Sequence, residues 1–81
     1  MDSDNNPYFR ARAAEISTSL EELAKFAEDP HSWVRTKAAG NKYTPMETLR
    51  NLANKDAFPH VQSTAQATMS KKREEEDLAQ I

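Results

Sequence analysis

One short pattern occurs three times along this chain. In this pattern a large apolar residue precedes a polar one, and alanine follows three residues after the polar one. The three copies are Phe9-Arg10 with Ala13, Val34-Arg35 with Ala38, and Val61-Gln62 with Ala65. Successive copies are 25 and 27 residues apart. A period in this range is typical of solenoids and other repeat arrays, in which each repeat is one supersecondary unit.

A second motif lies between these copies. Residues 18–23, TSLEEL, match residues 44–49, TPMETL, at an offset of 26, and the match continues through Phe26-Ala27 and Leu52-Ala53. The apolar residues in both segments have the i, i+3, i+7 spacing of an amphipathic helix. The chain therefore contains two and a half copies of a unit that has two short helices.

Local signals set the expected helix boundaries. Thr18 with Glu21, and Thr44 with Glu47, have the spacing of capping boxes, in which the threonine oxygen and the glutamate satisfy backbone N–H groups of the first turn. Gly40, the single glycine, is predicted to end the third helix in the left-handed conformation. No segment alternates long enough to predict a strand. The expected helices cover about residues 7–15, 19–27, 31–39, 45–54 and 59–75.

The unit resembles a known repeat family. The pattern V-R-x-x-A-A, followed by T-P-x-x-x-L-x-x-L-A and an aspartate, is similar to the variant leucine-rich repeat of bacterial proteins, and through it to HEAT and armadillo α-solenoids. The resemblance covers about residues 4–70, and the third copy departs from it with Gln62 in place of arginine. It implies an all-α fold, a short right-handed α-solenoid of about five helices, in one domain over residues 1–70. The family is functionally diverse, mostly in binding and scaffolding, so the resemblance alone implies no activity.

The arginines have two interpretations. Three pairs of residues are each six apart: Asp4 and Arg10, Asp29 and Arg35, Asp56 and Gln62. In HEAT-like repeats this spacing often marks a ladder of ion pairs between units, so the resemblance implies a structural role for both arginines. Alternatively, basic residues on equivalent helices form a stripe that follows a phosphate backbone. That stripe would contain Arg10, Arg12, Arg35, Lys37 and Lys42, with Lys71, Lys72 and Arg73 beyond it.

Aromatic rings occupy a further set of equivalent positions. Tyr8, Trp33 and His60 each precede the apolar residue of the first motif, so their side chains point about 100° away from the core. They either pack at the edge between units or form a patch that faces a partner, with Trp33 at its centre. Trp, Tyr and Arg dominate binding hot spots. The candidate partner-binding residues are therefore Tyr8, Arg12, Trp33, Arg35, Lys37 and His60.

Composition excludes several classes of function. The chain has 81 residues, no cysteine and one glycine, which excludes disulfides, thiol catalysis, cysteine-bound metals and glycine-rich phosphate loops. His31 and His60 are far apart, and no carboxylate lies at metal-binding spacing from either. We expect no enzymatic activity, no cofactor and no metal. No apolar run reaches the ~20 residues of a membrane span and no signal peptide opens the chain, so we expect a cytoplasmic protein without membrane contact.

The sequence favours a non-catalytic protein-binding module. Such a chain would be a small accessory protein, adaptor or inhibitor, of the kind found in bacteria and phages, that occupies a partner's surface. Two alternatives stay open. One is a small nucleic-acid-binding protein that uses the basic stripe, against which stands the formal net charge of −2. The other is a structural subunit of a homo-oligomer, such as a homodimer, because so few repeats leave apolar end faces.

The charged tail, residues 71–81, has two predicted states. Its acidic block lies toward the C-terminal end, where the helix dipole disfavours negative charge, so the segment is expected to fray as a solvated cap. The alternative is a helical extension that docks or oligomerises through Leu78 and Ile81.

Overall fold

The computed structural model describes residues 6–79, and the side chains of this range as far as Glu75. The described residues form helices and no strand, which confirms the all-α prediction. The helices are α1 (Pro7–Ile16), α2 (Leu20–Phe26), α3 (Ser32–Ala39), α4 (Met46–Lys55) and α5 (Pro59–Ala79). The predicted boundaries agree to within one residue except at the end of α5. That helix continues to Ala79, through the described part of the charged tail. The proposed docking residues Leu78 and Ile81 lie outside the described side chains.

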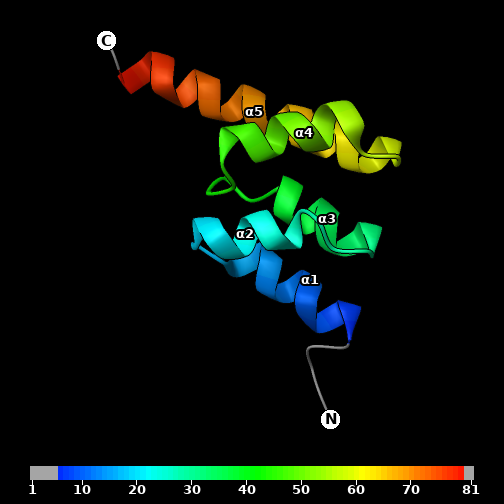
Figure 1. The fold of residues 1–81 in the computed structure, drawn as a ribbon. Coiled ribbons are helices and arrows are strands. Elements are labelled where there is room, and N and C mark those ends of the chain that lie inside the picture. Colours follow the sequence, from blue (N-terminus) through cyan, green and yellow to red (C-terminus); the bar gives the residue numbers. More distant parts are fainter. Residues whose placement is uncertain (1–5, 80–81) are drawn as a thin grey trace.

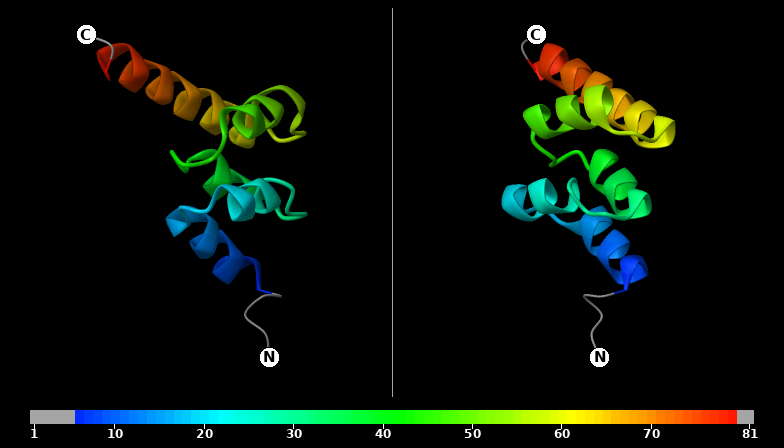
Figure 2. Two further views of the ribbon diagram at one scale, coloured as in Figure 1. Left: turned by 60° about the vertical axis from the view of Figure 1, so that its left-hand side comes forward. Right: turned by 45° about the vertical axis from the view of Figure 1, so that its right-hand side comes forward.

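The helices form two layers. α1, α3 and α5 lie side by side with α3 between the other two, while α2 and α4 form the second layer (Figure 1 and the right-hand view of Figure 2). Each pair of helices, α1–α2 and α3–α4, is one sequence unit, and α5 follows as the first helix of a third. The molecule measures 50 × 24 × 15 Å, because the C-terminal part of α5 extends past the other helices (Figure 2).

Side-chain caps fix the start of three helices. In each case an acceptor atom just before the helix takes a hydrogen bond from a backbone N–H group of the first turn, which has no partner within the helix. The acceptors, with donor–acceptor distances of 2.8, 3.3 and 3.1 Å, are Asn6 Oδ1, Ser19 Oγ and His31 Nδ1. A histidine in this position accepts through a ring nitrogen that carries no proton.

Both predicted capping boxes are wrong. α2 begins one residue later than expected, so Ser19 and not Thr18 provides its cap. Thr44 is completely buried, and its hydroxyl donates to the carbonyl oxygen of Ala38 at 2.6 Å. This bond fixes the loop after α3, and α4 begins after Pro45 without a side-chain cap. A buried hydroxyl needs a partner, and Thr44 finds it in a carbonyl oxygen at the end of the preceding helix.

Gly40 ends α3 as predicted, but it does not have the predicted left-handed conformation. Its backbone angles are φ −87° and ψ −3°, in the right-handed region, and no described residue has a positive φ. The left-handed ending is therefore wrong. The chain leaves the helix through a tighter turn, in which Asn41 N donates to the carbonyl oxygen of Ala38 at 3.2 Å.

Small residues form the core of the three-helix layer. Because alanine occupies the contact positions, neighbouring helix axes approach closely. The alanines that are at most 2% exposed are Ala11, Ala14, Ala38, Ala39 and Ala65. Val34 and Val61 are equally buried, whereas the equivalent Phe9 is 52% exposed. α1 is the outermost helix of its layer, so its outer side has no neighbouring helix within residues 6–79.

Candidate binding face

Ion pairs join the first helix of each unit to the loop after its second helix. Arg10 pairs with Asp29, and Arg35 pairs with Asp56, each through Nε to Oδ2 at 2.7 Å. A second bond from Nη2 to Oδ1 measures 3.1 Å in the first pair and 3.3 Å in the second. The carboxylate therefore comes from the loop after the second helix of the arginine's own pair, 19 or 21 residues after the arginine. Planar, two-point pairing of this kind is specific to arginine.

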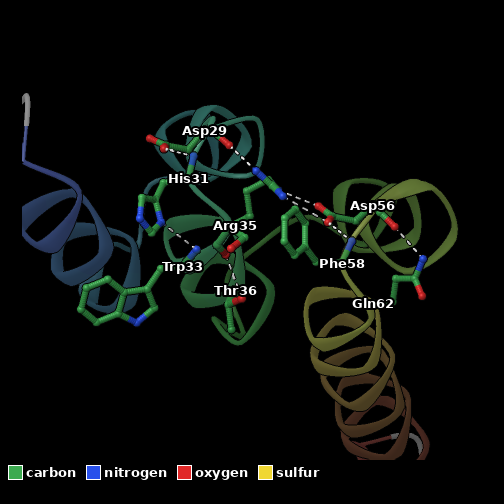
Figure 3. Close-up of polar contacts among 9 residues, drawn as sticks. Asp29, His31, Trp33, Arg35, Thr36, Asp56, Phe58 and Gln62 are labelled. Atoms are coloured by element: carbon green, nitrogen blue, oxygen red, sulfur yellow. Dashed lines mark hydrogen bonds and ion pairs between the residues drawn. The ribbon is translucent and has the colours of Figure 1, made fainter.

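The aspartate six residues before Arg35 has a different role from the one its spacing suggested. Asp29 offers Arg35 its backbone carbonyl oxygen, which accepts from Nη1 at 2.7 Å (Figure 3). Gln62 makes the same bond in the third unit, where its Nε2 donates to the carbonyl oxygen of Asp56 at 2.6 Å (Figure 3). Glutamine in place of arginine thus keeps the bond to the backbone carbonyl of the aspartate six residues earlier, but it makes no ion pair. Asp4, the predicted partner of Arg10, lies outside the described residues.

The ladder lowers the pKa of both aspartates. Burial alone raises the pKa of the Asp29 and Asp56 carboxyl groups, since it disfavours the charged form. The arginine hydrogen bonds, a backbone N–H bond from His31 or Phe58, and the arginine charge outweigh burial, so each pKa lies below the usual 3.8. Both carboxyl groups are ionised at neutral pH and hold the units together in that state.

Arg35 belongs to this ladder and not to the predicted patch. Its side chain is 14% exposed, and its guanidinium lies 5.4 Å from the centre of the Phe58 ring. Figure 3 shows Arg35 and Trp33 pointing away from α3 in different directions. The structure therefore separates Arg35 from the other candidate residues of this helix.

Four of the six candidates lie together on the α1–α3 surface. The rings of Tyr8 and Trp33 are 5.7 Å apart at 53°, and Trp33 is 44% exposed. The two rings border a hollow of about 170 Å³. Its other lining residues are Ala11, Arg12, Glu15 and Lys37. The equivalence of Tyr8 and Trp33 in the repeat had indicated this arrangement, because equivalent residues on stacked helices lie side by side.

His60 lies apart from the aromatic pair. It borders a second hollow of about 330 Å³ between α3 and α5, with Thr36, Thr64, Gly40, Lys37 and Glu15. His60 is exposed, and the ring contacts of Trp33 are with Tyr8 and His31. The three equivalent positions therefore give an aromatic pair and a separate histidine, not one continuous stripe.

Sequence reasoning missed a third hollow. It measures about 370 Å³ and lies where the end of α1, the α3–α4 loop and the middle of α5 meet. Its border includes Tyr43, Lys42, Lys71, Lys72 and Glu75. Lys72 is partly held, because its Nζ donates to the carbonyl oxygen of Thr44 at 2.8 Å. Lys42, Lys71 and Lys72 had appeared only as members of the basic stripe, and no pattern in the sequence had indicated Tyr43.

Asn41 joins the α3–α4 loop to the end of α1 through hydrogen bonds. It is 7% exposed, and its Nδ2 donates to the carbonyl oxygens of Ala14 at 2.9 Å and Ser17 at 2.7 Å. Its Oδ1 accepts from Tyr43 N at 2.8 Å. One side chain thus satisfies the free carbonyls at the end of α1 and fixes the loop that carries Lys42 and Tyr43. An asparagine next to a helix-ending glycine is the only signal of this role in the sequence.

The described part of the chain offers no metal-binding cluster, since no three His, Cys, Asp or Glu side chains in it lie close enough together. Within the same residues, no helix has the length and apolar character needed to cross a membrane. No protein-family model, curated protein or solved structure matches the chain in comparisons of its sequence and fold.

Proposed function

We propose that this chain is a non-catalytic protein-binding module, built as a short right-handed α-solenoid of two and a half variant leucine-rich or HEAT-like repeats. The repeat assignment is supported by the equivalent bonds that Arg35 and Gln62 make to Asp29 and Asp56. The stacking of α1, α3 and α5 in one layer also supports it. The binding surface is the α1–α3–α5 face, meaning the exposed side of that layer with its three hollows.

The observation that carries this proposal is the exposed aromatic pair. Tyr8 is 61% exposed and Trp33 is 44% exposed, and the two rings share a hollow with Arg12 and Lys37. Large aromatic rings with a neighbouring arginine, beside a pocket that a partner side chain can fill, are the composition of a binding hot spot. The ring of Trp33 contacts Tyr8 and His31 and stays partly exposed, so a partner can bury the remaining area.

The test is capture of partners from native lysate with and without nuclease, using the tagged chain and its Trp33→Ala and Lys37→Glu variants. We expect one stoichiometric protein to survive nuclease and to be lost with both variants. The matched controls are Leu20→Ala and Arg50→Glu, which change an exposed apolar residue and an exposed basic residue of the second layer. Equal loss in the controls would contradict the proposed face, and circular dichroism checks that every variant is folded.

A nucleic-acid ligand is the second candidate, favoured by the five basic residues that border the hollows. They are Arg12, Lys37, Lys42, Lys71 and Lys72. This candidate predicts recovery that disappears with nuclease and affinity that falls steeply with salt. The acidic Glu15 at the border of all three hollows weighs against a continuous phosphate contact.

A further inference from the structure

The three hollows form one groove across the α1–α3–α5 face. The first and second hollows share Glu15 and Lys37, and the second and third share Glu15 and Gly40. Gly40 has no side chain to separate the hollows that it borders. Neighbouring helices pack about 8–10 Å apart, so the groove crosses about 16–20 Å from α1 to α5. About five or six residues of extended chain, at ~3.3 Å per residue, cover this length.

The charge of the groove is opposite to that of the whole chain. Its border carries five basic residues and two acidic ones, Glu15 and Glu75, whereas the chain has a net charge of −2. Arg12, Lys42 and Lys71 are exposed, so their charged groups are accessible to a ligand. A groove with this balance raises the local concentration of acidic ligands and disfavours basic ones.

The two ends of the groove offer different contacts. At the α1–α3 end the hollow of about 170 Å³ lies beside Trp33 and Tyr8 and has apolar as well as basic walls. At the α5 end the border is formed mainly by lysines and the Tyr43 ring. A ligand that fits both ends carries an apolar side chain at one end and negative charges at the other.

We propose that the groove binds an extended, acidic segment of a partner protein, with one apolar side chain seated beside Trp33 and carboxylates near Lys42 and Lys71. A peptide fits better than a phosphate backbone because it can place an uncharged residue next to Glu15, whereas a nucleic acid carries a charge at every nucleotide. The inference rests on the proposed function and names the chemistry of the partner.

Trp33 is the only tryptophan of the chain, so its fluorescence reports directly on the groove. The probe is an acetylated twelve-residue peptide of glutamates with one central leucine, without tyrosine or tryptophan. Control ligands are the same peptide with glutamine for glutamate, and a twelve-nucleotide oligothymidylate. We expect a saturable change of Trp33 emission with the acidic peptide that weakens as salt increases, and no saturable change with the glutamine peptide.

Charge reversal then locates the contact. Lys42→Glu with Lys71→Glu should weaken peptide binding about tenfold or more, equivalent to at least about 1.4 kcal/mol. The matched double variant Lys25→Glu with Arg50→Glu changes two exposed basic residues of α2 and α4 and should leave the affinity within about twofold, since these sites are remote from the groove. Equal loss in both double variants would overturn the assignment.

The remaining outcomes separate this inference from the proposed function. If the acidic peptide leaves Trp33 emission unchanged while a protein partner is still lost on Trp33→Ala, the acidic segment is wrong and the binding module stands. If oligothymidylate binds and the peptide does not, both are wrong. A change of emission with the concentration of the chain alone would place a second copy in the groove and would also overturn the acidic partner.

Discussion

Arg35 connects three parts of the molecule through one side chain. It bonds to the carboxylate of Asp56, to the carbonyl oxygen of Asp29, and lies against the ring of Phe58. Both members of its ion pair are nearly buried, with side-chain exposures of 14% and 5%. Removing one member of such a pair leaves the other charge buried without compensation, which costs far more than the loss of a surface pair.

Arg35→Gln should therefore lower the free energy of unfolding by about 3 kcal/mol. Glutamine can keep the bond to the Asp29 carbonyl, as Gln62 does with Asp56, but it leaves the Asp56 carboxylate without its charge partner. Urea unfolding followed by circular dichroism measures the change. Arg50→Gln, at an exposed position of α4, should stay within about 0.5 kcal/mol of the original chain, and a similar loss in both variants would refute a specific role of the pair.

His31 provides a second prediction at this scale. Its Nδ1 accepts from Trp33 N at 3.1 Å, so it caps α3 directly beside the aromatic pair. His31→Ala should cost about 1 kcal/mol, and His31→Ser should recover most of it because serine is a better cap. Thermal unfolding of the three chains measures the order. If serine is no more stable than alanine, the histidine acts through its ring contact with Trp33 and not through the cap.

Among the elements, α3 shows how a helix ending decides the shape of a face. Gly40 lies in the right-handed region, and a Cβ placed on it would meet its nearest neighbours, Thr36 O and Thr64 Cγ2, at 3.6 Å. This is ordinary van der Waals contact. The glycine is therefore not required for the backbone conformation of the turn.

Gly40→Ala should raise the free energy of unfolding by about 0.4–1 kcal/mol, because alanine reduces the conformational freedom of the unfolded chain. The left-handed ending expected from the sequence would predict the opposite sign. Urea unfolding of the variant decides between these signs. A matched variant in the same turn, Asn41→Ala, should be clearly destabilised, since it removes the bonds to Ala14 and Ser17.

Element boundaries were predictable because the signals for them are local. Apolar spacing and proline positions located all the described helices, but they could not choose between the adjacent caps Thr18 and Ser19. The ladder was predictable only in part, because the carboxylate that pairs with Arg35 comes from Asp56, after the next helix, α4. The aromatic pair followed from the repeat. The hollow beside Tyr43 did not, since Tyr43 lies between the two repeated motifs.

For the whole molecule, the ladder predicts how stability depends on pH. The pKa values of Asp29 and Asp56 are lowered in the folded state, whereas aspartate in an unfolded chain titrates near pH ~3.9. A lowered folded pKa contributes stability that is fully present above the unfolded value and is lost as the pH falls through the folded value. From these two groups we expect constant stability between about pH 7 and pH 5 and a decline below about pH 4.

Urea midpoints at a series of pH values measure this dependence. The double variant Asp29→Asn with Asp56→Asn should be less stable at neutral pH and should show a smaller decline in acid, because its ladder no longer loses charge. A decline of the original chain that is already complete at pH 5, or an unchanged acid slope in the double variant, would contradict the assignment.

The ladder also makes the two ends of the α1–α3–α5 layer different, because arginine and glutamine occupy equivalent positions at opposite ends. Each arginine pairs with an aspartate that follows the next helix, so a unit whose first helix carries arginine also needs a carboxylate in the loop after its second helix. Gln62 keeps the neutral bond and makes no such demand. A duplication of residues 35–61 should therefore add one arginine–aspartate pair in register and keep Gln62 in the last helix of the three-helix layer.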